Sequence, residues 1–182
     1  MPVVQRGDPR AAYLTILLGR MGVEKLPADD LYDAVGLPRA ATKAWMLQTF
    51  ATGRPLAGWS VATPAEVKAL GISAAAVRAA ALRTYPALAD LPAILPAELH
   101  RSLPPDRHGW AVGQCLTNLE SRVMTVVLES VSRSGVVGLP MHDAIIVPAS
   151  CTATAVDSLR MACWAVARIE PVVKVSDARE LP

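Results

Sequence analysis

The stretch that most constrains the fold covers residues 135–150, with the sequence GVVGLPMHDAIIVPAS. Two short apolar runs, 136–139 and 144–147, flank the polar pair His142-Asp143, and such runs bounded by Gly and Pro are typical of strands. A strand-turn-strand hairpin would carry this pair at its tip, where both side chains can reach one cleft. His-Asp is also common in ordinary surface turns, so that alternative stays open.

The composition indicates a folded chain whose core is filled mainly by aliphatic side chains. Of the 182 residues, 52% are hydrophobic, 19% are charged and 4% are aromatic, which excludes a largely disordered chain. No apolar run reaches the ~20 residues of a membrane span, and the N-terminus lacks the apolar core of a signal peptide. Three cysteines without a CxxC pair predict reduced thiols in a cytoplasmic protein, not a disulfide framework or a structural zinc site. The net charge of +2 neither requires nor excludes a nucleic-acid partner.

Apolar periodicity predicts an α+β fold that is mostly helical and contains one small antiparallel sheet. Helices are expected over more than half of the chain, and strands at residues 3–7, 136–140, 144–148 and 172–175. One helical pattern begins at Pro9. The other clear helical patterns cover residues 38–52, 73–83, 110–133 and 152–169. Residues 85–105 are rich in proline and predict short turns of helix joined by loops.

Asp8 lies where the first predicted strand gives way to a helix. Pro9 suits the first turn of a helix, because the N–H that proline lacks is not needed there. Asp is also a preferred N-cap residue. A capping role and a chemical role for Asp8 are therefore both open.

Arg39 and Lys43 are four residues apart on the helix that Pro38 opens, so they lie on one face of it. Two cations at this spacing repel each other unless an anionic group lies between them. Arg with its planar fork and Lys as a point charge are suited to hold a triphosphate. The alternative is two independent, solvated side chains.

In this order, the three motifs resemble the palm and fingers of family A DNA polymerases and of the related single-subunit phage-type RNA polymerases. Motif A of that superfamily, a strand ending in Asp and followed by a helix, looks like DPRAAYLTILLGRMG at 8–22. Motif B, with Arg, three residues, Lys, and then an aromatic residue and Gly, is similar to RAATKAWMLQTFATG at 39–53. Motif C, His-Asp between apolar strands, is similar to LPMHDAIIV at 139–147. The helix entering it, with Leu119-Glu120-Ser121, looks like that of small phage- or plasmid-type members.

The resemblance implies a template-directed nucleotidyltransferase. It implies a single palm/fingers-like domain over 1–182, with fingers-like helices at about 28–105 inserted between palm pieces 1–22 and 110–182. The implied partners are a nucleic-acid template and primer and nucleoside triphosphates, without a membrane. The product, DNA or RNA, is left open.

The resemblance also implies roles for individual residues. Asp8 and Asp143 would hold Mg²⁺ or Mn²⁺ for two-metal catalysis, and His142 would orient the primer end or an Asp. Tyr13 stands five residues after Asp8, where DNA polymerases often have a Glu that screens the ribose. Lys43 and Arg39 would hold the triphosphate, and Phe50 would stack on the incoming base.

The sequence departs from the family pattern in ways that keep a second function open. Pro9 and Arg10 follow Asp8 where small or polar residues are usual, Phe50 lies one residue before the expected aromatic position, and Ala144 replaces the acid that often follows His-Asp. The chain also begins at motif A, without the upstream palm strands and thumb of such enzymes. We therefore expect a catalytic fragment, a subunit whose partner supplies the thumb or upstream palm, or an inactive palm-like protein that binds nucleic acid or a replication partner. An unrelated α/β domain is a third alternative.

Overall fold

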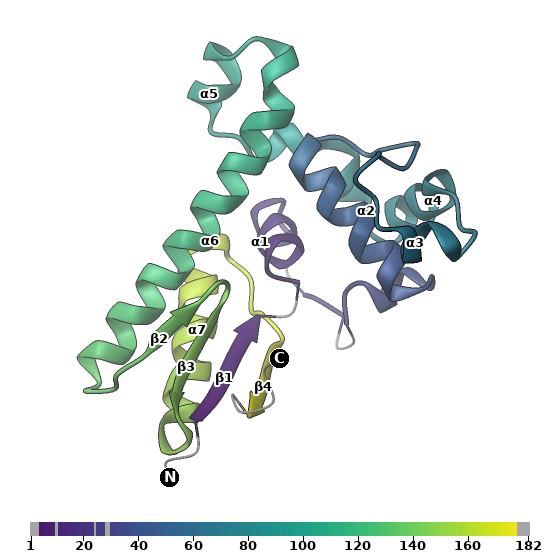
Figure 1. Cartoon of the computed structure of the whole chain (residues 1–182). Helices are drawn as coiled ribbons and strands as arrows, with labels where there is room; N and C mark the ends of the chain where they lie inside the picture. Colours follow the sequence, from purple (N-terminus) through teal and green to yellow (C-terminus); the bar gives the residue numbers. More distant parts are fainter. Residues whose placement is uncertain (1–3, 10, 24, 28–29, 178–182) are drawn as a thin grey trace. The chain divides into compact units, whose positions relative to one another are not determined.

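The computed structural model describes residues 4–9, 11–23, 25–27 and 30–177 (Figure 1). The chain forms two compact units, and each is described by itself. The first consists of residues 1–28 together with 117–182, and the second of residues 29–116.

The first unit contains a four-stranded antiparallel sheet with the strand order β2-β3-β1-β4. The strands are β1 (Val4–Pro9), β2 (Leu139–Met141), β3 (Ala144–Pro148) and β4 (Val173–Asp177). In the central strand β1, Gly7 pairs with Ile145 on one side and Val175 on the other. The prediction of a mostly helical α+β fold with a small antiparallel sheet is confirmed. Residues 136–138 are loop instead of strand, and Val3 lies outside the described residues.

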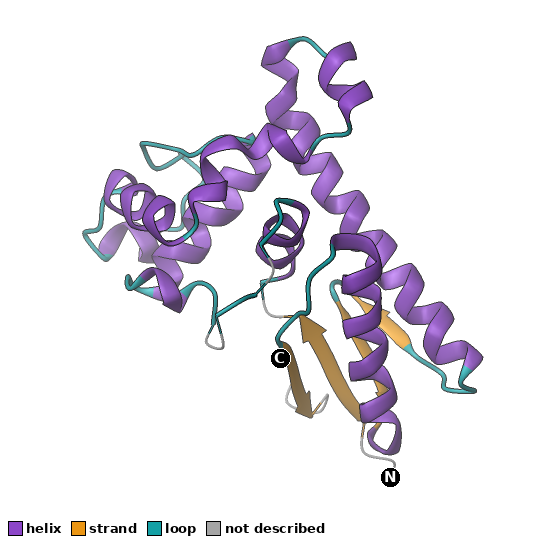
Figure 2. Cartoon of the chain, turned by 180° about the vertical axis from the view of Figure 1, so that it is seen from behind, coloured by secondary structure: helices purple, strands orange, loops and turns teal. Residues whose placement is uncertain are grey.

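Helices of the first unit include α1 (Ala12–Arg20) and α7 (Thr152–Ala167). Helix α6 (His108–Arg133) passes from the second unit into the first, where residue 117 begins that unit's share. Helix α7 lies against one face of the sheet (Figure 2). In β3, Ile145 and Val147 are buried while Ile146 between them is half-buried, so the alternation of the strand supplies an apolar face. Helix α7 contributes its own apolar stripe, which includes Leu159, Cys163 and Val166.

Helix α1 begins later than its sequence predicts. Asp8 and Pro9 continue the ladder of β1, pairing with Lys174 and Val173 of β4, so Pro9 does not open the helix. The chain then turns at Ala11, which has a left-handed φ of 50° and is the N-cap residue of α1. The capping role that was open for Asp8 is therefore wrong.

The second unit is helical. Its elements are η1 (Asp33–Val35), α2 (Arg39–Thr52), α3 (Ala65–Ala69), α4 (Ala74–Thr84), η2 (Pro86–Ile94), α5 (Ala97–Ser102), η3 (Pro105–Arg107) and the start of α6. The short helices after Tyr85 confirm the expectation for the proline-rich stretch. Ser73 caps α4 by accepting a hydrogen bond from the Ala76 N–H at 3.1 Å. The Tyr85 hydroxyl donates to the Leu31 carbonyl at 2.8 Å.

Among the described residues, no helix combines the length and the apolar content needed to span a lipid bilayer.

Candidate functional site

The strand register brings the two candidate acids to the same end of the sheet in the first unit. Gly7 of β1 pairs with Ile145 of β3, and the two strands are antiparallel. Asp8 follows Gly7 directly, and Asp143 lies two residues before Ile145. Two residues far apart in the sequence thus lie at the same end of the sheet, Asp8 near the end of β1 and Asp143 in the turn that precedes β3; these strands lie side by side in Figure 1.

His142 and Asp143 form the turn between β2 and β3, whose last pair is Met141 with Ala144. His142 has a left-handed φ of 54°, which is uncommon for a residue other than Gly but suits a two-residue hairpin. The His142 side chain is exposed and that of Asp143 is half-buried. Ile145, which is fully buried, anchors the strand that follows the turn.

Glu120 of α6 also lies at this end of the first unit, although it was not among the predicted site residues. Burial and the negative charge of Asp143 raise the pKa of the Glu120 carboxyl, while a hydrogen bond from Tyr13 and the nearby His142 partly oppose them. The Tyr13 hydroxyl also lies 3.2 Å from the Thr117 hydroxyl. The structure therefore gathers Tyr13, His142 and Asp143 around an acid that was not predicted.

A small pocket has Glu120 and Asp143 in its lining. It is lined by side chains of α1, α6, α7 and the turn: Ala12, Thr15, Ile16, Glu120, Val123, Met124, Asp143 and Cys163. The walls are mostly apolar, and the lining also includes the two acids Glu120 and Asp143. The negative charge of Asp143 acts on the Glu120 carboxyl. Burial raises the pKa of the Cys163 thiol to about 12, so this thiol stays protonated and acts as a wall of the pocket.

A signal for Glu120 was present in the sequence. Leu116, Val123 and Val127 lie four residues before it and three and seven residues after it, which places them on its own face of the helix. All three are buried. An acid inside an apolar helical stripe is unusual. A Glu at such a position therefore indicates a polar partner on another element of the fold.

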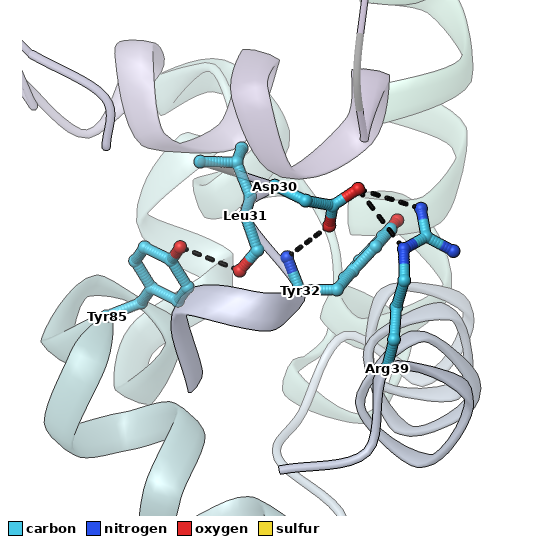
Figure 3. A network of polar contacts seen from close by, with 5 residues as sticks. All are labelled: Asp30, Leu31, Tyr32, Arg39 and Tyr85. Carbon is cyan, nitrogen blue, oxygen red and sulfur yellow. Dashed lines mark hydrogen bonds and ion pairs between the residues drawn. The ribbon is translucent and has the colours of Figure 1, made fainter. Parts of the chain in front are cut away.

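In the second unit, Arg39 is already bound by an acid (Figure 3). Its Nε and Nη2 donate to the Asp30 Oδ2 at 3.2 and 2.9 Å. The Tyr32 N–H donates to the Asp30 Oδ1 at 2.9 Å, and the Arg39 guanidinium lies 5.3 Å from the centre of the Tyr32 ring. Although burial opposes ionisation of Asp30, the hydrogen bonds from Arg39 and Tyr32 hold its pKa below the ordinary value.

Lys43 and Phe50 of α2 have different surroundings. Lys43 is exposed, and none of the ion pairs or hydrogen bonds between described residues engages its ammonium. Phe50 is only 2% exposed because it belongs with Trp45 and Met46 to the buried stripe of α2. The expected stacking of Phe50 on an incoming base is corrected accordingly, since its ring presents no open face.

Two carboxyl groups, those of Asp143 and Glu120, line the same pocket of the first unit. Considering only side chains that the structure describes, no three His, Cys, Asp or Glu residues gather closely enough to hold a metal ion. Asp143 and Glu120 nevertheless offer carboxylate oxygens, the ligands that Mg²⁺ prefers. Burial and, after it, the negative charge of Asp143 raise the pKa of the Glu120 carboxyl, and a nearby cation would relieve the second of these effects. These residues therefore fit a divalent cation, with Asp8 at the adjacent strand position.

The fold of the chain is similar to that of a DNA polymerase domain. The chain is similar in structure to the POL domain of Pol1 from M. smegmatis, solved in complex with a DNA primer-template and dNTP, with a TM-score of 0.51 and 15% sequence identity. The match covers 96% of this chain and 39% of that chain, so this chain spans about two fifths of its neighbour. At such low identity the likeness shows the fold alone.

No model of a known protein family matches the sequence, and no curated protein matches it.

Proposed function

We propose that the chain is a template-directed nucleotidyltransferase, or the catalytic part of one, related to family A DNA polymerases and phage-type RNA polymerases. The observation that carries this proposal is that Asp8 of β1 and Asp143 of the turn between β2 and β3 lie at the same end of the sheet. In this proposal residues 1–22 and 110–182 act as the palm, and the helices at about 28–105 act as the fingers.

Asp8 and Asp143 are the proposed ligands of Mg²⁺ or Mn²⁺. Bound divalent cations supply the positive charge that activates a primer 3′-oxygen and stabilises the leaving pyrophosphate. His142, on the exposed side of the turn, orients the primer end beside Asp143. The buried strand residue Ile145 keeps the turn in place, so Asp143 is held without a large conformational search.

Lys43 and Arg39 are the proposed contacts to the triphosphate, and Tyr13 faces the nucleotide sugar. The exposed ammonium of Lys43 can meet an outer phosphate directly. The Nε and Nη2 groups of Arg39 already donate to the Asp30 carboxylate, so only its other N–H donors can contact a phosphate while that ion pair is intact. The main phosphate contact is therefore assigned to Lys43.

Primer extension with the full chain tests this function. A labelled primer-template is incubated with Mg²⁺ or Mn²⁺ and with deoxyribonucleoside or ribonucleoside triphosphates in separate reactions. The parent is expected to lengthen the primer, and Asp143→Asn to abolish this, while Asp157→Asn on the exposed face of α7 keeps parental activity. Extension by Asp143→Asn at the parental rate would remove the proposal.

A second candidate, an inactive palm-like protein that binds nucleic acid or a replication partner, is favoured by two observations. Asp30 engages Arg39, and Ala144 occupies the position after His142-Asp143 where an acid often stands. This candidate predicts primer-template binding that does not change when EDTA removes divalent cations. Fluorescence anisotropy of a labelled primer-template with and without EDTA separates the two candidates.

A further inference from the structure

Two residues of α6 hold the hydroxyl of Tyr13. Thr117 and Glu120 are three residues apart, so their side chains share a face of the helix. The Tyr13 and Thr117 hydroxyl oxygens are 3.2 Å apart, and the Tyr13 hydroxyl donates to the Glu120 carboxyl. A tyrosine that comes five residues after Asp8 along the chain is thereby tied to a different element.

Glu120 also lies close enough to Asp143 for the charge of Asp143 to act on its carboxyl group. Both acids line one pocket together with Ala12 and Thr15 of α1. The Glu120 carboxyl thus lies next to Asp143, the proposed cation ligand, and accepts a hydrogen bond from Tyr13, which is proposed to face the nucleotide. This link fixes the distance between Tyr13 and Asp143.

A role in fold stability alone does not account for Glu120. Its neighbours on the helical face, Leu116, Val123 and Val127, are buried apolar side chains, and an apolar residue at the same position would complete that stripe. A half-buried acid beside another acid is unfavourable at neutral pH. The geometry therefore favours a role that requires its hydrogen-bond acceptor.

We propose that Glu120 is a positioning residue that fixes the Tyr13 ring relative to Asp143 and thereby sets how strictly the site selects the sugar of an incoming nucleotide. This inference rests on the proposed function. When Tyr13 is held by its hydroxyl, the ring forms a fixed wall beside Asp143. When that hydrogen bond is lost, the ring can rotate, and the site distinguishes ribose from deoxyribose less well.

The test measures the ratio of affinities for a ribonucleoside and a deoxyribonucleoside triphosphate, using the full chain with primer-template and Mn²⁺. Glu120→Ala removes the acceptor, and Tyr13→Phe removes the donor by deleting one oxygen. Each is expected to change the ratio about two- to tenfold, the range expected for one hydrogen bond. The double variant should change the ratio no more than either single variant, because both remove the same link.

Two controls separate positioning from general damage. Glu120→Gln keeps an acceptor oxygen and is expected to retain the parental ratio. Glu129→Ala lies on the same helix, where Glu129 is exposed and paired with Arg133 at 2.9 Å, and it should also leave the ratio unchanged. Tyr13→Phe alters so little volume that it tests the link even where Glu120→Ala fails to fold.

Each outcome decides the matter. Selective binding by the parent with an unchanged ratio in both Glu120→Ala and Tyr13→Phe overturns the positioning role and leaves the proposed function standing. Changes that add in the double variant show that the two residues act separately, which also overturns it. Absence of any nucleoside triphosphate binding by the parent overturns both this inference and the proposed function.

Discussion

Asp30 in the second unit and Glu120 in the first have carboxyl pKa values displaced in opposite directions. Asp30 is held below its ordinary value because hydrogen bonds from Arg39 and Tyr32 outweigh its burial. The pKa of Glu120 is raised by burial and by the neighbouring Asp143. Asp30 is paired with the cation Arg39 of its own unit, whereas Glu120 lies beside a second acid, Asp143.

The difference separates two uses of charge. The Asp30–Arg39 pair, at 2.9 Å, satisfies both partners and needs nothing from outside the protein. Asp143 and Glu120 carry like charge, which a folded chain tolerates more readily when a bound cation compensates it. The acids of the first unit are therefore the better candidates for chemistry, and four measurements can break or sharpen this contrast.

The largest effect is expected for Asp143→Asn on divalent-cation binding. Loss of residues that only support a metal ligand typically reduces affinity about 10–100-fold, so loss of a ligand should reduce Mn²⁺ affinity by more than about a hundredfold. Isothermal titration calorimetry with Mn²⁺ measures it, and Asp157→Asn serves as the matched control. Equal affinities of parent and Asp143→Asn would end the assignment of the acids to a metal site.

The next effect concerns Lys43 and Arg39, the two cations of α2. A charge-assisted contact contributes about 1.5–3 kcal/mol, so Lys43→Ala should weaken nucleoside triphosphate binding roughly ten- to a hundredfold and monophosphate binding less. Arg39→Ala should have a smaller effect, because Asp30 already holds that guanidinium.

Lys68→Ala, which removes an exposed lysine of the same unit, is the control for charge alone. If Arg39→Ala weakens triphosphate binding more than Lys43→Ala does, the assignment of the main phosphate contact to Lys43 is wrong.

A smaller effect is expected from Asp30→Asn on stability. Because the folded-state pKa of Asp30 lies below its ordinary 3.8, its stabilising effect is present above that value and is lost as the pH falls through the folded pKa. The Arg39 side chain is 49% exposed, so the free energy of unfolding should drop by only about 0.5–1 kcal/mol at pH 7. Urea unfolding at neutral and acidic pH should show this difference shrinking with acid, and a constant difference would contradict it.

The smallest effect is expected from Glu120→Gln in EDTA. The folded-state pKa of Glu120 lies above its ordinary 4.5, so its contribution to stability is present at low pH and is lost as the pH rises through the folded pKa. Above that point a neutral Gln removes the repulsion from Asp143 and should stabilise the chain by some tenths of a kcal/mol, up to about 1. Destabilisation by Glu120→Gln at pH 7 in urea titrations would show that the repulsion is unimportant.

The fold was largely predictable, because its signals are local. β-Branched runs between Gly and Pro marked the sheet, and the spacing of apolar residues marked α2, α4, α6 and α7. The start of α1 was missed because Asp8 and Pro9 pair with β4, a strand more than 160 residues away in the sequence. Local preference for a helix at Pro9 was overridden by that pairing.

The candidate site was predictable only in part. His142 and Asp143 stood out because a polar pair interrupts an apolar hairpin. The sequence predicted no site role for Glu120, since its neighbours Tyr13 and Asp143 come from other elements. Arg39 seemed available for phosphate because its partner Asp30 precedes the helix in a turn, and nothing in the spacing predicts that ion pair.

The left-handed backbone at His142 has a consequence for selection experiments. A residue with a β-carbon is strained by about 1–2 kcal/mol in this conformation, whereas Gly is not and Asn is more tolerant than most. A library randomised at position 142 and enriched only for expression or heat resistance should drift toward Gly and Asn. Enrichment for primer extension should keep His. The residue that survives at this one position would thus reveal which pressure the population has experienced.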